Sequence, residues 1–395
     1  MTGEPPVVDD GPERYPRGLL GATAAVRLAY FERRCTIEHP HLQAACAAVV
    51  HSICSPSEEA RLHRPGVTVL VIGPSRVGKT TLVQQLTRAL RHRAQPRMRR
   101  DPEHIPVVRF TATGAASGRY DWVDYYKAVL RQLADPFVDR RAASLRTRDL
   151  REATEEALSH RHPSAVIIDE AQHLAKANTG RRLQDQLDHL KCLENRTGVS
   201  HVLVGTYEMR PFRTASAQLA CRSLDVHFPR YDATAQPDRR AFRSVLWALQ
   251  RQLPVAQEPC LTEEQWQFLY ARSIGCIGLL KLHLNRALER ALAEDADTVT
   301  EAHLRATALA EDRVRLALSA ALAGEAELTE SAAADQRLLA LLGLEAAAVP
   351  GAAEALGRAH PGRPHPGERR PGRDAIGAAG RVAEEDRAGT DRAIG

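Results

Sequence analysis

Residues 67–86 read VTVLVIGPSRVGKTTLVQQL, and this stretch is the starting point for the whole chain. Its first part, Val67–Ile72, is an apolar and largely β-branched run, which is typical of a buried strand. A glycine-bearing turn follows over residues 73–80. The residues after the turn place apolar side chains on one face of a helix: Leu82, Val83, Leu86 and Leu90. The order strand, glycine-rich turn, helix predicts a binding site for phosphate groups.

The turn has the pattern G-x-x-x-x-G-K-T, and each fixed position has a physical reason. The glycines let backbone N–H groups point at a phosphate, and the helix N-terminus adds a favourable dipole. Lys79 is expected to reach the β- and γ-phosphates, and the Thr80 hydroxyl to hold Mg²⁺. We therefore predict ATP and Mg²⁺ as cofactors, with nucleotide contacts from Gly73, Pro74, Ser75, Arg76, Val77, Gly78, Lys79, Thr80 and Thr81.

A second motif is an apolar run that ends in two adjacent acids, AVIIDEAQHL at residues 165–174. Neighbouring side chains of a strand point in opposite directions, so the two acids are able to take different roles. Asp169 is predicted to belong to the Mg²⁺ shell. Glu170 is predicted to activate the attacking water as general base. Together with Lys79, these acids predict an ATPase.

Three further apolar runs, at residues 106–111, 201–204 and 225–228, complete a set of five short strands separated by helical segments. This alternation predicts a parallel α/β sheet that holds nucleotide at the carboxyl ends of its strands. Thr206 directly follows the strand at 201–204, where a polar side chain is able to touch the γ-phosphate or orient the water. The alternative for Thr206 is an ordinary turn at the end of a strand.

The remaining segments predict helices, loops and tails. Two helices are expected before the sheet, at 22–31 and 41–53, and residues 91–100 are interpreted as a basic connection broken by Pro96. After Pro237 the pattern becomes helical, with a capping box at Thr262–Gln265 and a last helix over 300–318. We expect a disordered N-terminus (1–16), an N-terminal helical extension (17–60), an α/β nucleotide-binding domain (61–235), a helical lid (236–330) and a mostly disordered tail (331–395).

The bulk composition is that of an ordinary water-soluble protein of mildly basic character. The 395 residues carry a formal net charge of +5, and 44% of them are hydrophobic. The seven cysteines show no C-x-x-C pair, which predicts reduced thiols and a cytoplasmic protein, with Cys46 and Cys192 packed in helices. The sequence has no apolar run long enough to span a bilayer and no signal-peptide pattern. The aromatic residues Trp122 and Tyr125 are predicted to pack in the core and not to stack on bases.

The order of phosphate loop, acidic strand, polar strand tip and helical lid resembles an AAA+ ATPase. Three segments resemble more narrowly the TniB/TnsC family of transposition ATPases, which includes MuB-like target-selection regulators. They are GPSRVGKTTLV at 73–83, VLVGTYEMRPF with QLACRSLDVHFPRY between 202 and 231, and SIGCIGLLKLHLNRAL at 273–288. The resemblance covers roughly residues 40–309.

The resemblance implies a mechanism of assembly on DNA. Subunits that hold ATP would line up on double-stranded DNA as a ring or helical filament, without sequence preference. An integrase-type transposase and a target-selection protein of the TniQ/TnsD type would recognise that homo-oligomer, and hydrolysis would disassemble it. Arg222 would be the arginine finger that acts on a neighbour's nucleotide, or it would bind a surface acid. The family often has arginines where this chain has Cys221 and Leu224. Lys281 matches the second sensor position and would contact nucleotide from the lid.

DNA contact in such an assembly would be made through phosphates. The positions where pore-facing segments of the family should fall are Thr111, Arg119, Arg140, Arg141, Arg146 and Arg148. The basic run from 140 to 151 is equally compatible with a solvated helix face. Two other functions remain open from the sequence. One is a different AAA+ ATPase, such as a helicase loader or an ExeA-like regulator. The other is an ATP-binding scaffold that does not hydrolyse.

Overall fold

The structure is a computed structural model, and it describes residues 14–54, 66–114, 121–135, 146–176, 181–214, 223–328 and 332–344. The chain divides into two compact units, residues 1–329 and 330–395. The second unit contains helix α17 (Ala332–Leu341), which forms inside the tail that was expected to be mostly disordered. The rest of that tail, from residue 345, and residues 1–13 lie outside the described residues.

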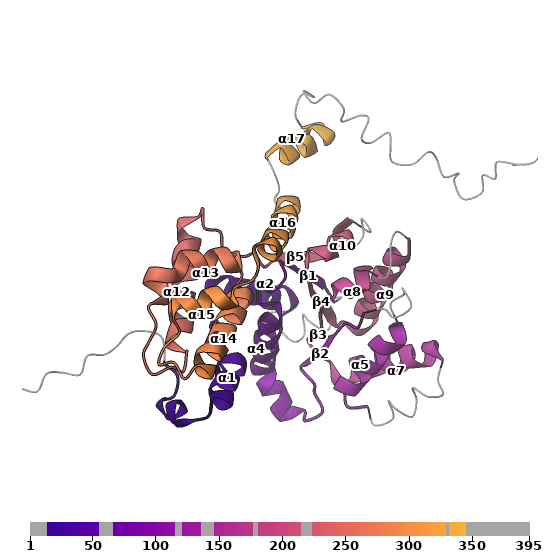
Figure 1. The fold of residues 1–395 in the computed structure, drawn as a ribbon. Coiled ribbons are helices and arrows are strands. Elements are labelled where there is room, and N and C mark those ends of the chain that lie inside the picture. The colour runs from indigo at the N-terminus through magenta and orange to yellow at the C-terminus, as the bar shows by residue number, and fades with distance from the viewer. Residues whose placement is uncertain are drawn as a thin grey trace, which may run out of the picture. The chain divides into compact units, whose positions relative to one another are not determined.

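The first unit is built on a five-stranded parallel sheet (Figure 1). Its strands are β1 (Thr68–Ile72), β2 (Val107–Thr111), β3 (Ala165–Asp169), β4 (Ser200–Gly205) and β5 (Leu224–His227). The spatial order is β2-β3-β4-β1-β5, so β1 lies between β4 and β5. The predicted α/β sheet is confirmed.

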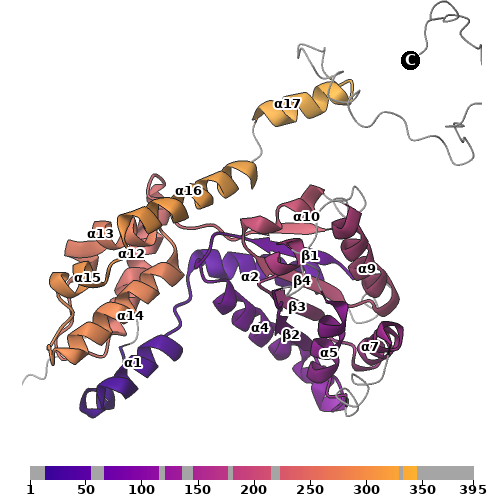
Figure 2. The same ribbon diagram turned by 45° about the vertical axis from the view of Figure 1, so that its right-hand side comes forward.

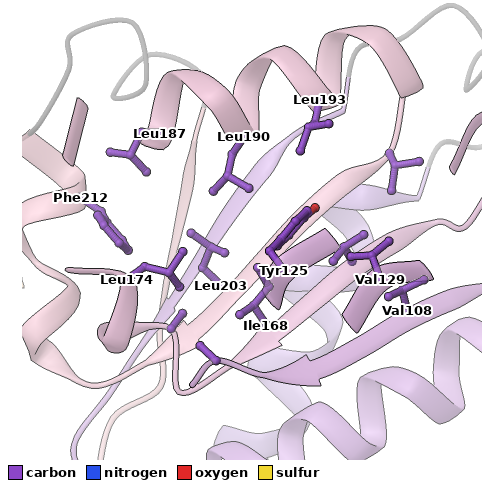
Figure 3. Close-up of a cluster of buried hydrophobic side chains, with 14 of the residues drawn as sticks. Val108, Tyr125, Val129, Ile168, Leu174, Leu187, Leu190, Leu193, Leu203 and Phe212 are labelled. Carbon is purple, nitrogen blue, oxygen red and sulfur yellow. The ribbon is translucent and has the colours of Figure 1, made fainter. Parts of the chain in front are cut away.

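Each face of the sheet buries a different set of alternating side chains, as strand geometry requires. On β1, Val69 and Val71 face α2 (Pro40–Ile53) and α4 (Lys79–Arg100). Leu70 and Ile72 face the other side, which is covered by α5 (Trp122–Gln132), α7 (Thr147–Arg161) and α9 (Arg181–Thr197). Figure 3 shows this second cluster, in which Tyr125 is packed between the sheet and α9. The prediction that Tyr125 is a core residue is therefore confirmed, since its side chain is 1% exposed.

A group of helices follows the sheet and has its own hydrophobic core. It consists of α12 (Gln236–Arg251), α13 (Trp266–Ser273), α14 (Ile277–Ala293) and α15 (Glu301–Thr307), and we call it the lid. Helix α1 (Ala24–Arg33) joins the lid, because Phe31 is buried in the lid core. Helix α16 (Glu311–Leu328) leaves the lid and reaches the sheet side of the unit (Figure 2). The remaining elements are the short helical turns Arg17–Gly21, Tyr207–Met209 and Leu261–Gln265, together with α8 (Gln172–Lys176) and α10 (Pro211–Thr214).

Several local predictions were wrong. Helix α4 continues through Pro96 to Arg100, because its arginine, alanine, glutamine and methionine residues favour helix on both sides of the proline. No capping box forms at Thr262: its hydroxyl donates to Gln250 Oε1, and a π-type turn precedes α13. The helix expected over 300–318 is two helices, because Ala308 takes an extended conformation.

The cysteine and membrane expectations have mixed outcomes. Cys46 is buried in α2 as predicted, whereas Cys192 is exposed on α9, so its predicted packing was wrong. All six cysteines within the described ranges are free thiols. No helix in those ranges has both the length and the apolar character needed to cross a membrane.

Candidate nucleotide-binding site

The loop between β1 and α4 depends on two glycines for different reasons. At Gly73 an added Cβ would lie 2.2 Å from the carbonyl oxygen of Phe228, so only glycine fits beside the end of β5. Gly78 has a backbone φ of +121°, which residues with a side chain rarely adopt, and it is the N-cap of α4. The loop therefore ends with the free N–H groups of the first turn of a 22-residue helix. This is the arrangement that binds a phosphate group.

Lys79 lies in the first turn of α4, and its side chain is buried under the loop. Its ammonium donates to the carbonyl oxygens of Pro74, at 2.7 Å, and Gly73, at 3.2 Å. Burial lowers the pKa of Lys79 to about 8, although the charges of Glu170 and Asp169 act in the opposite direction. A charge held with so little water around it interacts strongly with any anion that enters the loop.

Thr80 and Asp169 join α4 to the end of β3. The Thr80 hydroxyl donates to Asp169 Oδ2 over 3.2 Å, and the backbone N–H of Glu170 donates to Asp169 Oδ1 over 2.9 Å. Burial raises the pKa of the Asp169 carboxyl above its ordinary value. A hydroxyl oxygen and a carboxylate oxygen at this separation are a donor set that suits Mg²⁺. These two residues are thus able to hold the predicted metal ion.

Glu170 stands at the tip of β3 in a left-handed backbone conformation, with φ of +54°. Such a conformation is uncommon for a residue with a side chain and is concentrated at functional sites. The carboxylate of Glu170 accepts a hydrogen bond from the side-chain amide of Gln172. The same amide group accepts, through Oε1, a hydrogen bond of 3.3 Å from the backbone N–H of Thr206. Gln172 therefore links the tips of β3 and β4.

Sequence reasoning missed Gln172, although the motif AVIIDEAQHL contains it. The glycine at position 205 is the sequence feature that could have indicated this contact. An added Cβ on Gly205 would lie 2.6 Å from Gln172 Oε1 and 2.2 Å from the sulfur of Met209. Gly205 thus leaves room for the amide to reach Thr206. The Thr206 hydroxyl itself donates to Glu208 over 3.2 Å.

Lys79, Thr80, Glu170, Gln172 and Thr206 line one cavity of about 750 Å³. The loop contributes Pro74, Ser75, Arg76, Gly78, Lys79, Thr80 and Thr81. The strand tips contribute Glu170, Gln172, Thr206, Tyr207 and Glu208. The lid and α16 contribute Ile274, Gly278, Ala317, Ala320 and Ala321. The cavity has one cationic end at the loop and one acidic end at the strand tips, which fits a triphosphate with its metal ion.

The lid packs closely against the rest of the unit at two further glycines, one beside the phosphate loop and one beside the segment after β5. An added Cβ on Gly278 would lie 2.3 Å from the carbonyl oxygen of Arg76, and one on Gly275 would lie 2.1 Å from that of Tyr231. Gly275 also has φ of +77° and accepts a 3.0 Å hydrogen bond from the backbone N–H of Tyr231. The segments 229–231 and 274–278 therefore form the junction between sheet and lid. This position of the lid places the start of α14 directly on the phosphate loop.

The comparison with known families agrees with this geometry. Residues 63–212 match the AAA domain family. This stretch is therefore similar to an AAA domain, and the five-stranded parallel sheet with the helices after it has the AAA+ α/β fold. None of the curated proteins matches the chain in sequence.

Solved structures with a related arrangement are distant from this chain. The ORC2 protein of Aeropyrum pernix in ADPNP and ADP complexes is 15% identical, over 71% of this chain and 70% of that one, with a TM-score of 0.49. Drosophila ORC bound to DNA is 15% identical, over 79% and 71%, with a TM-score of 0.45. Cdc6p of Pyrobaculum aerophilum is 14% identical, over 71% and 69%, with a TM-score of 0.46.

Helix α16 forms a wall of the cavity of the AAA domain. Gly324 lies against the ring of Tyr207, where an added Cβ would come within 2.2 Å of ring carbons. Beside it, Glu325 forms an ion pair with the buried Arg230, with Arg230 Nε 3.0 Å from Oε1 and Nη2 3.1 Å from Oε2. Glu327 forms another ion pair with Arg210. Sequence reasoning did not predict that α16 reaches the site, since small residues give little sign of their partners.

Among the predicted nucleotide ligands, the Lys281 side chain lies away from the cavity and the Val77 side chain points into the core. Lys281 does not line the cavity; its ammonium donates to the carbonyl oxygens of Glu32, at 2.9 Å, and Cys35, at 2.5 Å, at the end of α1. Val77 has a buried side chain in the core between the sheet and α4, so it offers only its backbone to a ligand. Arg222, the predicted arginine finger, lies outside the described residues.

The predicted DNA contacts are only partly described. Thr111 is exposed at the carboxyl end of β2, in register with Asp169. Arg146 and Arg148 are exposed at the start of α7, and Arg148 forms a 2.9 Å ion pair with Glu152. Arg119, Arg140 and Arg141 lie outside the described residues.

Proposed function

We propose that this protein is an ATPase that binds ATP with Mg²⁺ in the cavity of its AAA domain and hydrolyses it there. The observation that carries the proposal is the single cavity that gathers Lys79, Thr80 and Glu170, with Asp169 hydrogen-bonded to Thr80 at its edge. One end of this cavity binds phosphate, and the other supplies a carboxylate that is able to accept a proton.

The residues of the chain divide the work of this reaction. The N–H groups of the first turn of α4 and the Lys79 ammonium bind the β- and γ-phosphates. Thr80 and Asp169 would hold Mg²⁺, which would supply positive charge beside the phosphate oxygens. Glu170 accepts the proton of the attacking water, and Gln172 orients the Glu170 carboxylate through its amide. Thr206 orients the water or touches the γ-phosphate.

We propose further that a second copy completes the pocket. Among the described residues that line the cavity, the cations are Arg76 and Lys79, both from the phosphate loop. None of the described lining residues that come from the strand tips is cationic, so that side of the cavity has no positive charge to offer the γ-phosphate. An arginine from a neighbour, with Arg222 as our choice, would stabilise the charge that develops in hydrolysis. Hydrolysis would then depend on assembly of the homo-oligomer.

The finer proposal is that the ATP-bound oligomer assembles on double-stranded DNA, recruits an integrase-type transposase and a TniQ/TnsD-type target selector, and disassembles on hydrolysis. Its support is the sequence resemblance of residues 73–83, 202–231 and 273–288 to TniB/TnsC ATPases. Two of these segments contact each other at the sheet–lid junction through Tyr231 and Gly275. The alternatives are another AAA+ ATPase, such as a helicase loader or ExeA-like regulator, and a scaffold that binds ATP without hydrolysis.

The experiment is imaging of the protein with duplex DNA, Mg²⁺ and a non-hydrolysable ATP analogue. The proposal expects rings or filaments with the wild type and none with Lys79→Ala, because that variant lacks the charge that holds the phosphates. Lys191→Ala, on α9 and distant in sequence from the loop, is the matched control and should assemble normally. Assembly of Lys79→Ala that still requires nucleotide would overturn the proposal.

A further inference from the structure

Helix α4 extends well past the core of the AAA domain. Its last buried residue is Leu90, yet the helix continues for ten residues to Arg100. All residues from 91 to 100 are exposed or half-exposed. At about 1.5 Å per residue this makes a solvated helical extension about 15 Å long. A helix usually continues only where packing supports it, so this extension needs another explanation.

The extension carries positive charge and no negative charge. Arginines occupy positions 88, 91, 93, 97, 99 and 100, and residues 88–100 contain no Asp or Glu. The face that packs on the sheet through Leu86 and Leu90 is continued by Arg93, Arg97 and Arg100, at successive spacings of three, four and three residues after Leu90. Where the helix leaves the sheet, arginine therefore replaces leucine on the inner face, and the charge surrounds the helix.

The two acids that directly follow the extension are bonded to other groups. Asp101 Oδ1 accepts a hydrogen bond from the backbone N–H of Glu103, and the Glu103 carboxylate pairs with Arg161 and His160, both at 3.1 Å. Like charges three and four residues apart destabilise a helix, and Pro96 removes a backbone donor. A bound polyanion would compensate for both costs.

The extension lies at the edge of the sheet opposite to the nucleotide. The phosphate loop occupies the carboxyl ends of the strands, and α4 runs back from it so that β2 is able to start parallel to β1. Arg100 is therefore at the amino ends of the strands. A ligand bound there would leave the ATP cavity accessible.

We infer that the extension of α4, residues 91–100, together with the exposed Arg88 beside it, is a docking surface for the phosphate backbone of double-stranded DNA. This inference rests on the DNA binding of the proposed function and adds a surface that the predicted contacts on β2 and α7 do not include. The extension has no Phe, Tyr or Trp, so it lacks the large aromatic rings on which the bases of a single strand usually stack.

Protein and RNA partners fit the extension less well. Met98, at 40% exposure, is its large exposed apolar side chain, whereas protein interfaces centre on clusters of aromatic and apolar anchors. A helix with cations on all sides fits the major groove of B-DNA, which is wide enough to admit it, with phosphates on both walls. The deep and narrow major groove of double-stranded RNA does not admit a helix.

The test compares two quadruple variants with the same loss of charge. The first is Arg91→Gln, Arg93→Gln, Arg99→Gln and Arg100→Gln on the extension. The control is Arg286→Gln, Arg290→Gln, Arg313→Gln and Arg315→Gln, all exposed on the lid side. Binding to a fluorescent 30-base-pair duplex of mixed sequence is followed by anisotropy from 50 to 300 mM salt, with thermal unfolding and ATP binding as checks on folding.

The inference expects the extension variant to bind the duplex at least tenfold more weakly, with a salt slope smaller by about 3 to 4. The control should change the slope by less than about 1. A variant with lysine at the same four positions should bind like the wild type, because lysine keeps the charge. An extension variant that binds ATP and duplex like the wild type would overturn the inference while leaving the proposed function intact. A wild type that binds no DNA would overturn both, and equal binding to single strands would overturn the choice of duplex.

Discussion

The hydroxyl of Thr80 donates to Oδ2 of Asp169 over 3.2 Å, which joins the first turn of α4 to the end of β3. The two residues are 89 positions apart in the chain, and they meet because β1 and β3 end at the same edge of the sheet. The pair supplies the oxygen atoms proposed for Mg²⁺. Its chemistry leads to the first prediction.

Thr80→Val keeps the shape of the side chain and removes one oxygen. ATP affinity measured with excess Mg²⁺ should fall by about tenfold or more, toward the value measured with EDTA, because the metal loses a ligand. Thr87→Val is the control on the same helix, since Thr87 is buried and bonded only to the carbonyl of Val83. If Mg²⁺ raised the ATP affinity of Thr80→Val as much as that of the wild type, the metal would be held by other residues.

The burial of Lys79 makes nucleotide-free stability depend on pH. Its pKa is about 8 when folded, against 10.5 for an unperturbed lysine. The unfolded chain therefore binds more protons between these values, and the free energy of unfolding should rise as pH increases from 8 to 10.5. In the wild type this rise should be on the order of 3 kcal/mol, and Lys79→Met should lack it. Urea unfolding at pH 8 and pH 10 gives the change in the free energy of unfolding for each protein. The same change in the wild type and in Lys79→Met would contradict the burial of Lys79.

Gln172 is predicted to be a positioning residue for Glu170. Gln172→Ala removes the amide that links the Glu170 carboxylate to the backbone of Thr206. The kcat for ATP hydrolysis should fall by about 10- to 100-fold while KM changes little, because the phosphates are bound at the other end of the cavity. Steady-state phosphate release gives both constants. A loss confined to KM would show that Gln172 shapes binding and does not orient the base.

Gly324 is predicted to fix α16 to the AAA domain. Alanine in a helix normally adds stability, but at Gly324 its Cβ would overlap the ring of Tyr207. Gly324→Ala should therefore lower the free energy of unfolding by about 1–3 kcal/mol. Ser319→Ala, on the exposed face of the same helix, should be neutral or slightly stabilising. Urea unfolding decides; a stabilised Gly324→Ala would mean that α16 does not dock on Tyr207.

The sequence predicted the parts of the fold whose residues are sufficient to determine local structure. The run 67–72, the glycines of the loop and the acids after 165–168 identify the strand ends and the phosphate site without any long-range information. The alternation of Val69 and Val71 with Leu70 and Ile72 follows from a sheet covered on both faces.

The remaining features depend on contacts between distant residues. Nothing local in Gly324 indicates Tyr207, and nothing in Lys281 indicates that the end of α1 would accept its hydrogen bonds. Pro96 was interpreted as a break because proline usually ends a helix, whereas strong helix formers on both sides carried α4 through it. Gln172 was visible in the sequence, but its role depends on the tip of β4.

The central claim is that Glu170 activates the water that hydrolyses ATP held by the phosphate loop. The most direct measurement is phosphate release by the wild type and Glu170→Gln, with duplex DNA and saturating Mg²⁺ and ATP, alongside ATP binding. Our account predicts that Glu170→Gln binds ATP normally and releases phosphate at least about 100-fold more slowly. Equal rates of phosphate release from the two proteins would contradict it.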